Sequence, residues 1–566
     1  KIKLRNVKTM SKHDLLIIGA GLAGLRAAVE GVRQGLNVAV ITKVHPVRSH
    51  SNAAQGGINA ALTDRGDDWR DHALATIKGS DYLADQDAVE VMCREAGEAI
   101  IELENMGVIF SRDDEGKLGT RAFGGQKKAR TYFVGAITGS ALLHVLYEQS
   151  VKYNLHIYEE WFVTKLIKED GRIAGAIAFD IKTGQMEMIS AKAVVLATGG
   201  AGRVFEPSTN ALICTGDGLS LAMQVGVPLM DTEMIQYHPT TLSGNGILLS
   251  EAARGDGAYL INSEGERFME KYAPEYMELA SRDVVSRAEQ TEIDEGRGVD
   301  GCVFLDLRHL GKKFIEDRLG YLQEVALEFR GIDLSEKPIP IKPGMHYIMG
   351  GIKTDLNGAT NVPGLYAAGE CANVSVHGAN RLGANSLLDT IVFGRRSAIE
   401  SVDYIKSVKD VEIDPKELSK EKSRIQSILE RPKGMRSAEL RDKMGSTMTK
   451  GIGVWRDTDS INFAIEGMKS VRGQLSNVYV ENKGKVFNTD LTSYLELEFM
   501  VDVAESICQG ANARFESRGA HFRTDITKRN DKDWLKHTIV EYNGEELNTT
   551  SEKVTITDWE PTERVY

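Results

Sequence analysis

The sequence predicts an α/β protein, and three observations carry that prediction. Residues 14–43, DLLIIGAGLAGLRAAVEGVRQGLNVAVITK, have the pattern of a buried strand, a glycine turn, a helix and a second buried strand. Two later apolar runs, KAVVLATGGAG at residues 192–202 and GLYAAGEC at 364–371, also run into glycines. After about residue 403 the pattern becomes helical and charged, and the last stretch alternates as β-strands do.

The first glycine turn has the spacing GxGxxG, between a strand at 15–18 and a helix that ends near Gln34. Gly19, beside Ala20, permits the tight turn, Gly21 lets the backbone approach a pyrophosphate, and Gly24 lets the helix pack on the strand. The helix amino terminus offers free N–H groups and a favourable dipole to phosphates. We therefore predict a dinucleotide site here; the alternative is a turn that is rich in glycine for steric reasons alone.

The second strand, at 38–41, departs from the usual pattern at its end. An acidic residue normally follows and holds the ribose hydroxyl, but here Thr42 and Lys43 stand in that place. Either a hydroxyl holds the ribose or the cofactor lies differently. Both residues are candidate cofactor contacts, and the departure weakens an NAD interpretation.

Composition excludes several classes of protein. The chain has 566 residues, a net charge of −12 and no long basic tract, so nucleic acid is not an expected partner. The five cysteines form no CxxC pair, which argues for reduced thiols and against an iron–sulfur cluster held by this chain alone; no metal site is predicted. No run of about 18 apolar residues exists to span a membrane. The start is too short and polar for a secretory signal, and Met10 is a candidate natural start.

Each of the three predicted strands is a short apolar run that ends in glycines, so we place all three in one sheet. The segment between the second and third strand would then contain an inserted domain. The predicted domains are residues 10–240 with 346–402, the insert 241–345, a helical domain 403–520 and a small β-containing region 521–566.

Longer motifs carry a resemblance to a family. They are RSHSNAAQGGINAAL, RAFGGQ, ATGGAG, TGDG, QYHPT, SEAARGDG, SRDVVSR, HYIMGG, AAGEC, HGANRLGANSLLD and ESRGAHFRTD. In this order the chain resembles the flavoprotein subunit of succinate dehydrogenase and fumarate reductase, from residue 14 to about 540. The resemblance implies an FAD-binding Rossmann-like domain with an inserted capping domain, and oxidation of succinate to fumarate or the reverse.

The resemblance also implies how FAD is held. The histidine of the RSH motif, His50, would be bonded covalently to the flavin; His45 is the competitor, and a turn histidine beside non-covalent FAD is the alternative. Attachment can raise the reduction potential of the flavin, which suits removal of hydride from an unactivated CH₂–CH₂ bond. The other implied FAD contacts are Ser49, Gln55, Gly56, Gly57, Asp217, Glu370, Ser386 and Leu387.

A dicarboxylate needs cations and donors at both ends, ideally forked guanidinium groups. By resemblance the carboxylate ligands are His238, His346 and Arg381, with Ser250 in place of a family threonine. Phe123 of RAFGGQ would pack on the substrate or simply in the core. A lone histidine or arginine is more often structural, and only the motif contexts raise these residues above that interpretation.

The resemblance assigns proton transfer to Arg282, helped by Glu251 and Arg254, while the flavin accepts hydride. The role is unusual because arginine normally stays protonated. Glu251 and Arg254 are three residues apart, hence on one face if the segment is helical. A structural ion pair is the alternative. The insert would act as a lid that excludes water.

Electrons on the flavin would pass to an iron–sulfur partner subunit and then to a quinone, with membrane anchor subunits as indirect partners in electron transport and the tricarboxylic acid cycle. Arg514, Arg518 and Arg523 fall in a region expected near that partner or the flavin. The expected location is the cytoplasmic face of a prokaryotic membrane, with the matrix side of the mitochondrial inner membrane left open. The alternatives are an L-aspartate oxidase, a flavin reductase of sulfur compounds and a non-catalytic FAD-binding subunit.

Overall fold

The computed structural model describes residues 11–124, 126 and 128–563; Met10, the candidate natural start, lies outside the described residues. The first unit is the strand–turn–helix–strand predicted from sequence: β1 (Ser11–Ile18), α1 (Leu22–Arg33) and β2 (Val38–Thr42). The strands run parallel, with Leu15 opposite Val38. Such a pair requires a crossover, and α1 supplies it because its apolar side packs on the sheet.

The main sheet joins segments that lie far apart in the sequence. Its order is β6 (His156–Glu159), β2, β1, β9, β8 (Arg172–Asp180) and β7 (Trp161–Glu169), with β16 also paired to β9. Strand β9 (Met186–Leu196) runs parallel to β1, and β16 (Leu365–Ala367) runs parallel to the last residues of β9. The prediction that these three strands share a sheet is confirmed. Since their carboxyl ends meet at one edge, the glycine turns that follow them lie together there.

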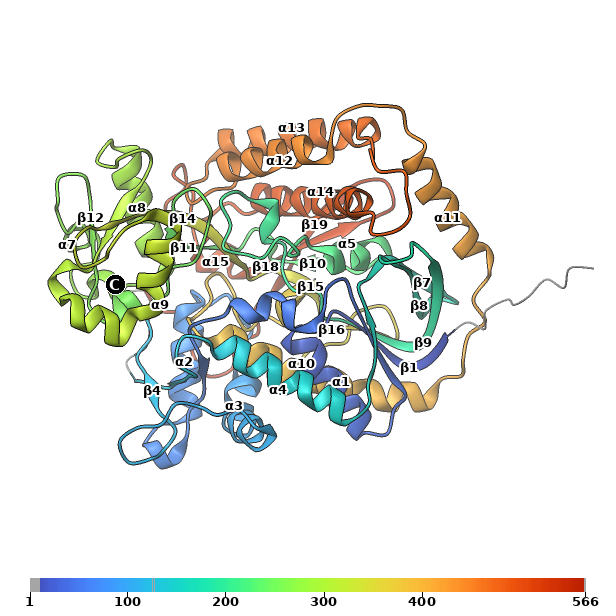
Figure 1. Ribbon diagram of the computed structural model, residues 1–566, viewed down its shortest axis with the longest axis horizontal. Coiled ribbons are helices and arrows are strands. Elements are labelled where there is room, and N and C mark those ends of the chain that lie inside the picture. Colours follow the sequence, from blue (N-terminus) through green and yellow to red (C-terminus); the bar gives the residue numbers. More distant parts are fainter. Residues whose placement is uncertain (1–10, 125, 127, 564–566) are drawn as a thin grey trace, which may run out of the picture.

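The segment between β9 and β16 contains a second sheet with its own core. Its order is β11-β14-β13-β12, all antiparallel, and it runs from β11 (Ile235–Leu242) to β14 (Ile339–Ile348). Between these lie β12 (Tyr259–Ile261), α8 (Arg282–Asp294), β13 (Val303–Asp306) and α9 (Lys312–Arg330). Figure 1 shows these elements together at the left of the molecule, away from β1 and β9.

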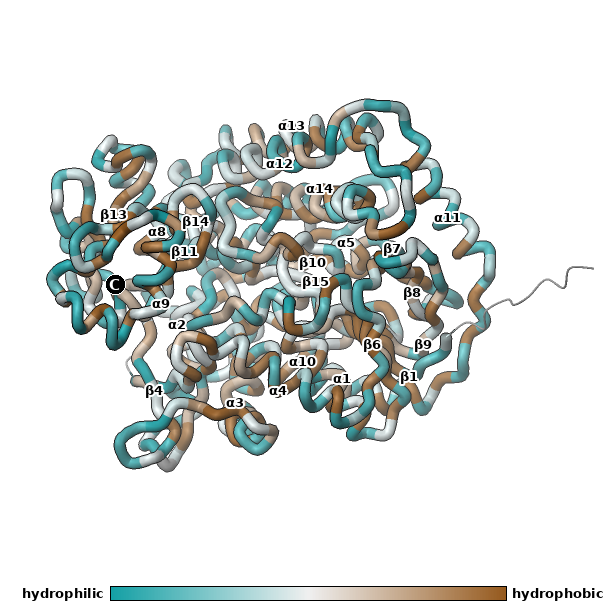
Figure 2. Tube along the Cα trace, viewed as in Figure 1, coloured by the Kyte–Doolittle hydropathy of each residue, from teal (hydrophilic) through white to brown (hydrophobic). Residues whose placement is uncertain are grey.

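The region after residue 403 is largely helical. Helices α11 (Lys416–Leu429), α12 (Ser437–Gly451), α13 (Thr458–Gln474) and α14 (Thr489–Ala513) follow one another, with α12, α13 and α14 packed together along one side of the molecule (Figure 1). Hydrophobic and hydrophilic residues alternate around these tubes in Figure 2, as expected for helices with one buried side.

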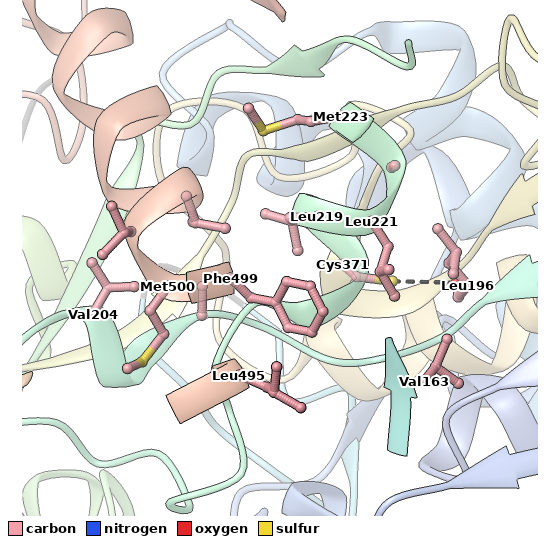
Figure 3. Packing of buried hydrophobic residues seen from close by; sticks show 14 of the residues in the cluster. Val163, Leu196, Val204, Leu219, Leu221, Met223, Cys371, Leu495, Phe499 and Met500 are labelled. Carbon is pink, nitrogen blue, oxygen red and sulfur yellow. Dashed lines mark hydrogen bonds between the residues drawn. The ribbon is translucent and has the colours of Figure 1, made fainter. Parts of the chain in front are cut away.

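The innermost helix, α14, joins this layer to the main sheet through a continuous apolar core. Its side chains meet α5 (Asp217–Gln224) and strands of the main sheet, as Figure 3 shows. The labelled residues of that contact are Val163, Leu196, Val204, Leu219, Leu221, Met223, Cys371, Leu495, Phe499 and Met500. The cysteine Sγ donates to the carbonyl of Leu196 at 3.2 Å. All five cysteines are buried and free of disulfides.

The last region contains a hairpin, β18 (Lys536–Tyr542) and β19 (Leu547–Lys553), which pairs with β10 (Leu229–Met230) in the body of the protein. The alternating residues VTIT at 554–557 are not part of it; they follow its second strand. Among the described residues, every helix is too short or too polar to cross a bilayer.

Candidate functional site

One cavity of about 460 Å³ lies at the carboxyl edge of the main sheet and extends to the inserted sheet. It collects nearly all of the residues that sequence analysis selected from distant motifs. They are Gly19, Ala20, Gly21, Thr42, Lys43, Ser49, His50, Gln55, Gly56, Gly57, Phe123, Asp217, His238, Ser250, Glu251, Arg282, His346, Glu370, Arg381, Ser386 and Leu387. The two selected residues outside this lining are Gly24 and Arg254.

The glycine turn forms one end of the cavity. Gly19 has φ +109°, and a Cβ there would lie 2.2 Å from the carbonyl oxygen of Ala197. A Cβ on Gly24 would lie 2.0 Å from the Gly19 carbonyl oxygen, so this glycine sets the approach of α1 to the strand. A Cβ on Gly21 would meet only Ser51 closely, at 3.3 Å, and the Ser51 hydroxyl accepts a hydrogen bond from the backbone N–H of Leu22 at 3.3 Å. The other N–H groups at the start of α1 have no side-chain cap, so the turn leaves backbone N–H groups and space for a pyrophosphate.

Lys43 and Asp217, two predicted cofactor contacts, bind each other. Lys43 Nζ donates to Asp217 Oδ2 at 2.8 Å and to Glu496 Oε1 at 2.7 Å. Burial opposes the charged lysine, but the two carboxylates outweigh it and raise the lysine pKa. Thr42 Oγ1 donates to the carbonyl of Val44. Glu496, from α14, was not found by sequence analysis, since nothing in its local pattern distinguishes it from a helix-surface glutamate.

His50 lies in a short 3₁₀ helix, η2 (His50–Ala53), between the glycine turn and the inserted sheet. The backbone N–H of Ala211 donates to its Nδ1 at 3.2 Å, which leaves Nε2 as the ring nitrogen for another contact. Burial, and then the charge of Arg203, lower the pKa of His50 to about 4, so the ring is neutral at pH 7. His45, the competitor, faces Glu159 at 3.8 Å and is not among the residues that line the cavity.

The opposite wall of this end is formed by residues 368–370, in the turn after β16, and by the start of α10 (Asn385–Ser407). Glu370 accepts a hydrogen bond from the backbone N–H of Ile348 at 3.3 Å, and burial raises its pKa to about 7. Ser386 and Leu387 begin α10, and Ser386 Oγ accepts from Arg381 Nη1 at 3.1 Å. The first residues of α10 thus connect the glycine-turn end of the cavity with its cationic end.

Two guanidinium groups converge at the cationic end. Arg282 Nη1 and Arg381 Nη2 each donate to Gln236 Oε1 at 3.0 Å. Burial, and then the charge of Arg282, lower the pKa of Arg381 to about 10, so the Arg381 guanidinium is still charged at pH 7. Gln236 was not selected from the sequence, although it stands inside the QYHPT motif, two residues before His238.

His238 and His346 face each other with ring centroids 4.9 Å apart. Burial, and then the charge of Arg282, hold both pKa values well below 6.5, so both rings are neutral. The backbone N–H of Thr240 donates to His238 Nδ1 at 3.2 Å, so Nε2 of that ring carries the proton. Thr209 Oγ1 contacts His346 Nδ1 at 2.8 Å. Thr209 belongs to no motif that sequence analysis could use.

Glu251 lies behind Arg282 and connects it with Arg254. Its Oε2 accepts from Arg282 Nε at 2.8 Å and lies 3.6 Å from Arg254 Nη2. Burial alone would raise the glutamate pKa, but the charges of Arg282 and Arg254 lower it to about 2. Glu251 is the N-cap of the single-turn helix α6 (Ala252–Gly255), which brings Glu251 and Arg254 to one side as their spacing predicts.

The remaining predicted substrate contacts complete the wall. Phe123 fits over two glycines: a Cβ on Gly56 would lie 2.8 Å from its ring, and one on Gly383 would lie 2.7 Å from it. Ser250 Oγ accepts from the backbone N–H of Ala252 at 3.3 Å, so its own proton is available to the cavity.

The charges of this end do not cancel. Three guanidinium groups, those of Arg254, Arg282 and Arg381, surround the single ionised carboxylate of Glu251. Because Glu370, which also acts on Arg381, is only partly ionised at its pKa of about 7, a net positive charge remains in a buried site, a costly arrangement without a partner. A ligand with two carboxylates would neutralise it.

Comparison with known proteins relates the whole chain to flavoproteins. Residues 14–387 match the family model described as FAD binding domain, and residues 441–566 match that described as fumarate reductase flavoprotein C-term. The chain is 44% identical to the succinate dehydrogenase flavoprotein subunit of Rickettsia conorii, over 98% of both proteins. It is 42% identical to the fumarate reductase flavoprotein subunit of Mycobacterium tuberculosis, over 98% of this chain and 99% of the relative. A solved structure of E. coli quinol fumarate reductase superposes with a TM-score of 0.95 at 37% identity, covering 99% of each chain.

Proposed function

The chain belongs to the succinate dehydrogenase and fumarate reductase flavoprotein family, and on that premise we propose that its cavity interconverts succinate and fumarate beside bound FAD. One observation carries the proposal: Arg282 and Arg381 meet neutral His238 and His346 in the cavity whose other end is the glycine turn. The first end matches a dicarboxylate in charge and the second offers N–H groups to a pyrophosphate.

FAD fits the glycine-turn end. Gly19 and Gly24 bring backbone and helix together more closely than a Cβ would allow, and Gly21 leaves its side open. Covalent attachment through His50 is part of the proposal. It is supported by the neutral ring, whose Nδ1 is already engaged by Ala211, so that Nε2 remains for a bond to carbon.

The chain's own residues bind the substrate and move the proton. FAD, when bound, supplies the hydride acceptor. Arg381 and the Nε2–H of His238 hold carboxylate oxygens and fix the CH₂–CH₂ bond. Arg282 exchanges the proton of the second carbon, with Glu251 as its hydrogen-bonded neighbour. The insert contributes Ser250, Glu251 and Arg282, and as a closing lid it would exclude water.

The proposal includes a larger complex. The relatives are named as flavoprotein subunits, and this chain has no CxxC array to carry electrons onward. An iron–sulfur subunit would accept electrons and pass them to a quinone, with membrane anchor subunits beyond it. The chain would then sit peripherally at a membrane, on the cytoplasmic face in a prokaryotic cell.

Dye reduction by the FAD-loaded chain tests the activity. Succinate should reduce the dye, and L-aspartate at the same concentration should not, because the additional ammonium group of L-aspartate would bring a further positive charge into a site that already has an excess of it. Faster turnover of L-aspartate would overturn the proposal in favour of an aspartate oxidase.

Acid denaturation followed by a gel viewed for flavin fluorescence tests the covalent bond. Fluorescence should stay with the wild-type chain and with His45→Ala, and should be lost from His50→Ala. Loss from the wild type, after full loading with FAD, would leave a non-covalent cofactor.

A further inference from the structure

Glu289 is a buried carboxyl group that no step described so far uses. It lies on α8, seven residues after Arg282, and its side chain is 0% exposed. Residues seven apart lie on the same side of a helix. Neither carboxyl oxygen has a hydrogen-bond partner in the described part of the chain. A wholly buried acid without partners is costly, so its presence requires an explanation.

Arg254 faces Glu289 from α6. It is also buried, and its Nε and Nη2 have no hydrogen-bond partners among the described residues, while Nη1 donates to the carbonyl of Glu278 at 2.6 Å. The charge of Arg254 acts on Glu289, yet the two groups form no ion pair within 4.0 Å. Arg254 therefore offers two free N–H donors, and Glu289 offers two free carboxyl oxygens. Together they provide the three or four hydrogen-bond partners that a buried water between them would require.

Other titratable groups lie on the elements packed against α8, and none of them is among the charges that act on Glu289. On β11, Tyr237 donates to the carbonyl of Ile452 and His238 faces His346; on α7 (Met269–Tyr272), Tyr272 donates to Glu292. On β13, Asp306 is paired with Arg308. Strand β14 carries Lys342, His346 and Tyr347, and Tyr347 contacts His377. Arg254 is therefore the charged group that governs Glu289.

We propose that Glu289 is a positioning residue that stores the exchangeable proton at the inner end of the chain Arg282–Glu251–Arg254. The inference deepens the proposed function and rests on it. In the resting state Glu289 carries a proton, Glu251 is ionised, and both arginines are charged.

The proton movements balance in the direction of fumarate reduction. Arg282 gives one proton to the substrate carbon, Glu251 passes one from Arg254 to Arg282, and Glu289 returns one to Arg254, directly or through a water. No arginine ends deprotonated, and Glu289 ends as a carboxylate. Succinate oxidation runs the same steps in reverse: it starts from ionised Glu289, which is the final acceptor and returns its proton to solvent before the next turnover.

The charges favour this assignment. Before the transfer, two guanidinium groups share one carboxylate; afterwards each has a carboxylate of its own. Burial raises the pKa of Glu289 well above its usual value, and the charge of Arg254 opposes that rise. A buried carboxyl group without hydrogen-bond partners favours its protonated form, and the nearby charge of Arg254 favours release of the proton when Arg254 needs one. Glu289 thereby offsets the reluctance of an arginine to give up its proton.

Replacement of Glu289 in the FAD-loaded full chain tests the inference. Glu289→Gln keeps the shape but cannot store a proton; Glu289→Met fills the site without polar atoms; Glu289→Asp retains the acid. We expect Gln and Met to lower kcat about tenfold, with KM for succinate within about twofold, since a relay residue one step removed contributes less than a direct acid or base. Asp should recover much of kcat.

Glu292→Gln is the matched control. Glu292 is on the same helix and equally buried, but Arg297, Tyr272 and Asn262 already bind it. This variant should lose stability and keep the wild-type pH profile of kcat. Glu289→Gln should shift that profile, and its infrared spectrum should lack one protonated-carboxyl band that the wild-type chain shows at pH 7.

The outcomes separate the two levels of the argument. If Arg282→Gln turns over normally, the proposed function and the relay both fail. If Arg282→Gln is inactive while Glu289→Gln and Glu289→Met match the wild type in kcat and pH profile, only the inference about Glu289 fails. A wild-type infrared spectrum that Glu289→Gln leaves unchanged would overturn it even if a variant folds poorly.

Discussion

Two groups of buried arginines differ in how they are neutralised. The cavity group consists of Arg254, Arg282 and Arg381, with Glu251 as their shared carboxylate. The C-terminal cluster consists of Arg514, Arg518, Arg523, Glu233, Glu516 and Asp525. There, Arg514 Nε binds Glu233 at 2.7 Å, Arg518 Nε binds Glu516 at 2.7 Å, and Arg523 Nη2 binds Asp525 at 2.7 Å.

This difference separates arginines that bind a ligand from arginines that stabilise the fold. Every side-chain nitrogen in the C-terminal cluster's arginines has a partner, whereas Arg254 and Arg381 keep unpartnered nitrogens. Buried positive charge without compensation is retained where a ligand will supply the compensation. None of the three C-terminal arginines lines the cavity, so the structure does not place them at the predicted flavin site. They hold the last region of the chain against the body of the protein.

The largest expected effect is in the cavity group. Arg282→Gln should lower kcat for succinate by about 10³-fold, within the range for loss of a general acid or base. Flavin should stay bound, because Arg282 contacts Glu251 and Gln236 and not the glycine turn. Dye reduction and the flavin spectrum of the same sample measure both.

Arg287→Gln is the matched control for that variant. Arg287 is on the same helix but binds Asp283 and the carbonyl of Gly519, outside the cavity lining. It should turn over within a few-fold of the wild type. Equal losses in both variants would mean that α8, rather than the Arg282 guanidinium, had been disturbed.

The C-terminal cluster should respond in stability instead. Arg514→Met leaves Glu233 buried without its cation, while Glu516 keeps Arg518, and breaking a buried pair in this way costs about 3–5 kcal/mol. Urea unfolding of the FAD-loaded chain measures the loss. Turnover per bound flavin should stay near that of the wild type; a selective loss of turnover would erase the distinction between the two groups.

The pH dependence of stability sharpens the comparison. His537 binds Asp231 at 2.6 Å, and despite burial that carboxylate raises the histidine pKa to about 10. A raised pKa stabilises fully below the unfolded value near 6.5, and the contribution is lost as pH rises toward 10. Thermal stability should fall across that window, by at most about 1.4 kcal/mol per pH unit.

His537→Gln removes the titrating group and should flatten this fall. Because Asp231 also contacts Arg514 at 3.5 Å, the variant retains one cation for the aspartate and should still fold. An equally steep fall in His537→Gln would assign the pH dependence to other groups.

Local patterns predicted much of the fold. The glycine spacing and the apolar runs around it are short-range signals, so β1, α1 and β2 were predicted close to their observed bounds. The common sheet was predicted because three separate strands have the same pattern, an apolar run followed by glycines. The alternating residues 554–557 lie outside the C-terminal hairpin, because alternation alone does not tell a strand from an extended tail.

The site residues that the sequence did not reveal owe their positions to the pairing register of strands that lie far apart in the sequence. Strands β11 and β14 change register between Gln236 and Tyr237 and again after His238, and these irregularities turn Gln236 toward both arginines. Glu289 shows no local signal either, since an acidic residue in a polar helix is ordinarily exposed. Which side of α8 it occupies depends on contacts that spacing cannot supply.

The smallest expected effect concerns Thr209, which contacts His346 without reaching the arginines. Thr209→Val keeps the shape and removes one hydrogen bond, worth about 1 kcal/mol, so KM for succinate should rise about fivefold with kcat little changed. Thr360→Val, whose hydroxyl donates to the carbonyl of Val362 far from the cavity, is the control and should leave KM unchanged. A fall in kcat at constant KM would instead show that the orientation of His346 matters in the transition state, because an interaction made only there changes kcat and not substrate binding. His346 would then belong with Arg282 in the chemical step, and the cavity group would be divided between binding by Arg381 and His238 and catalysis by the other two.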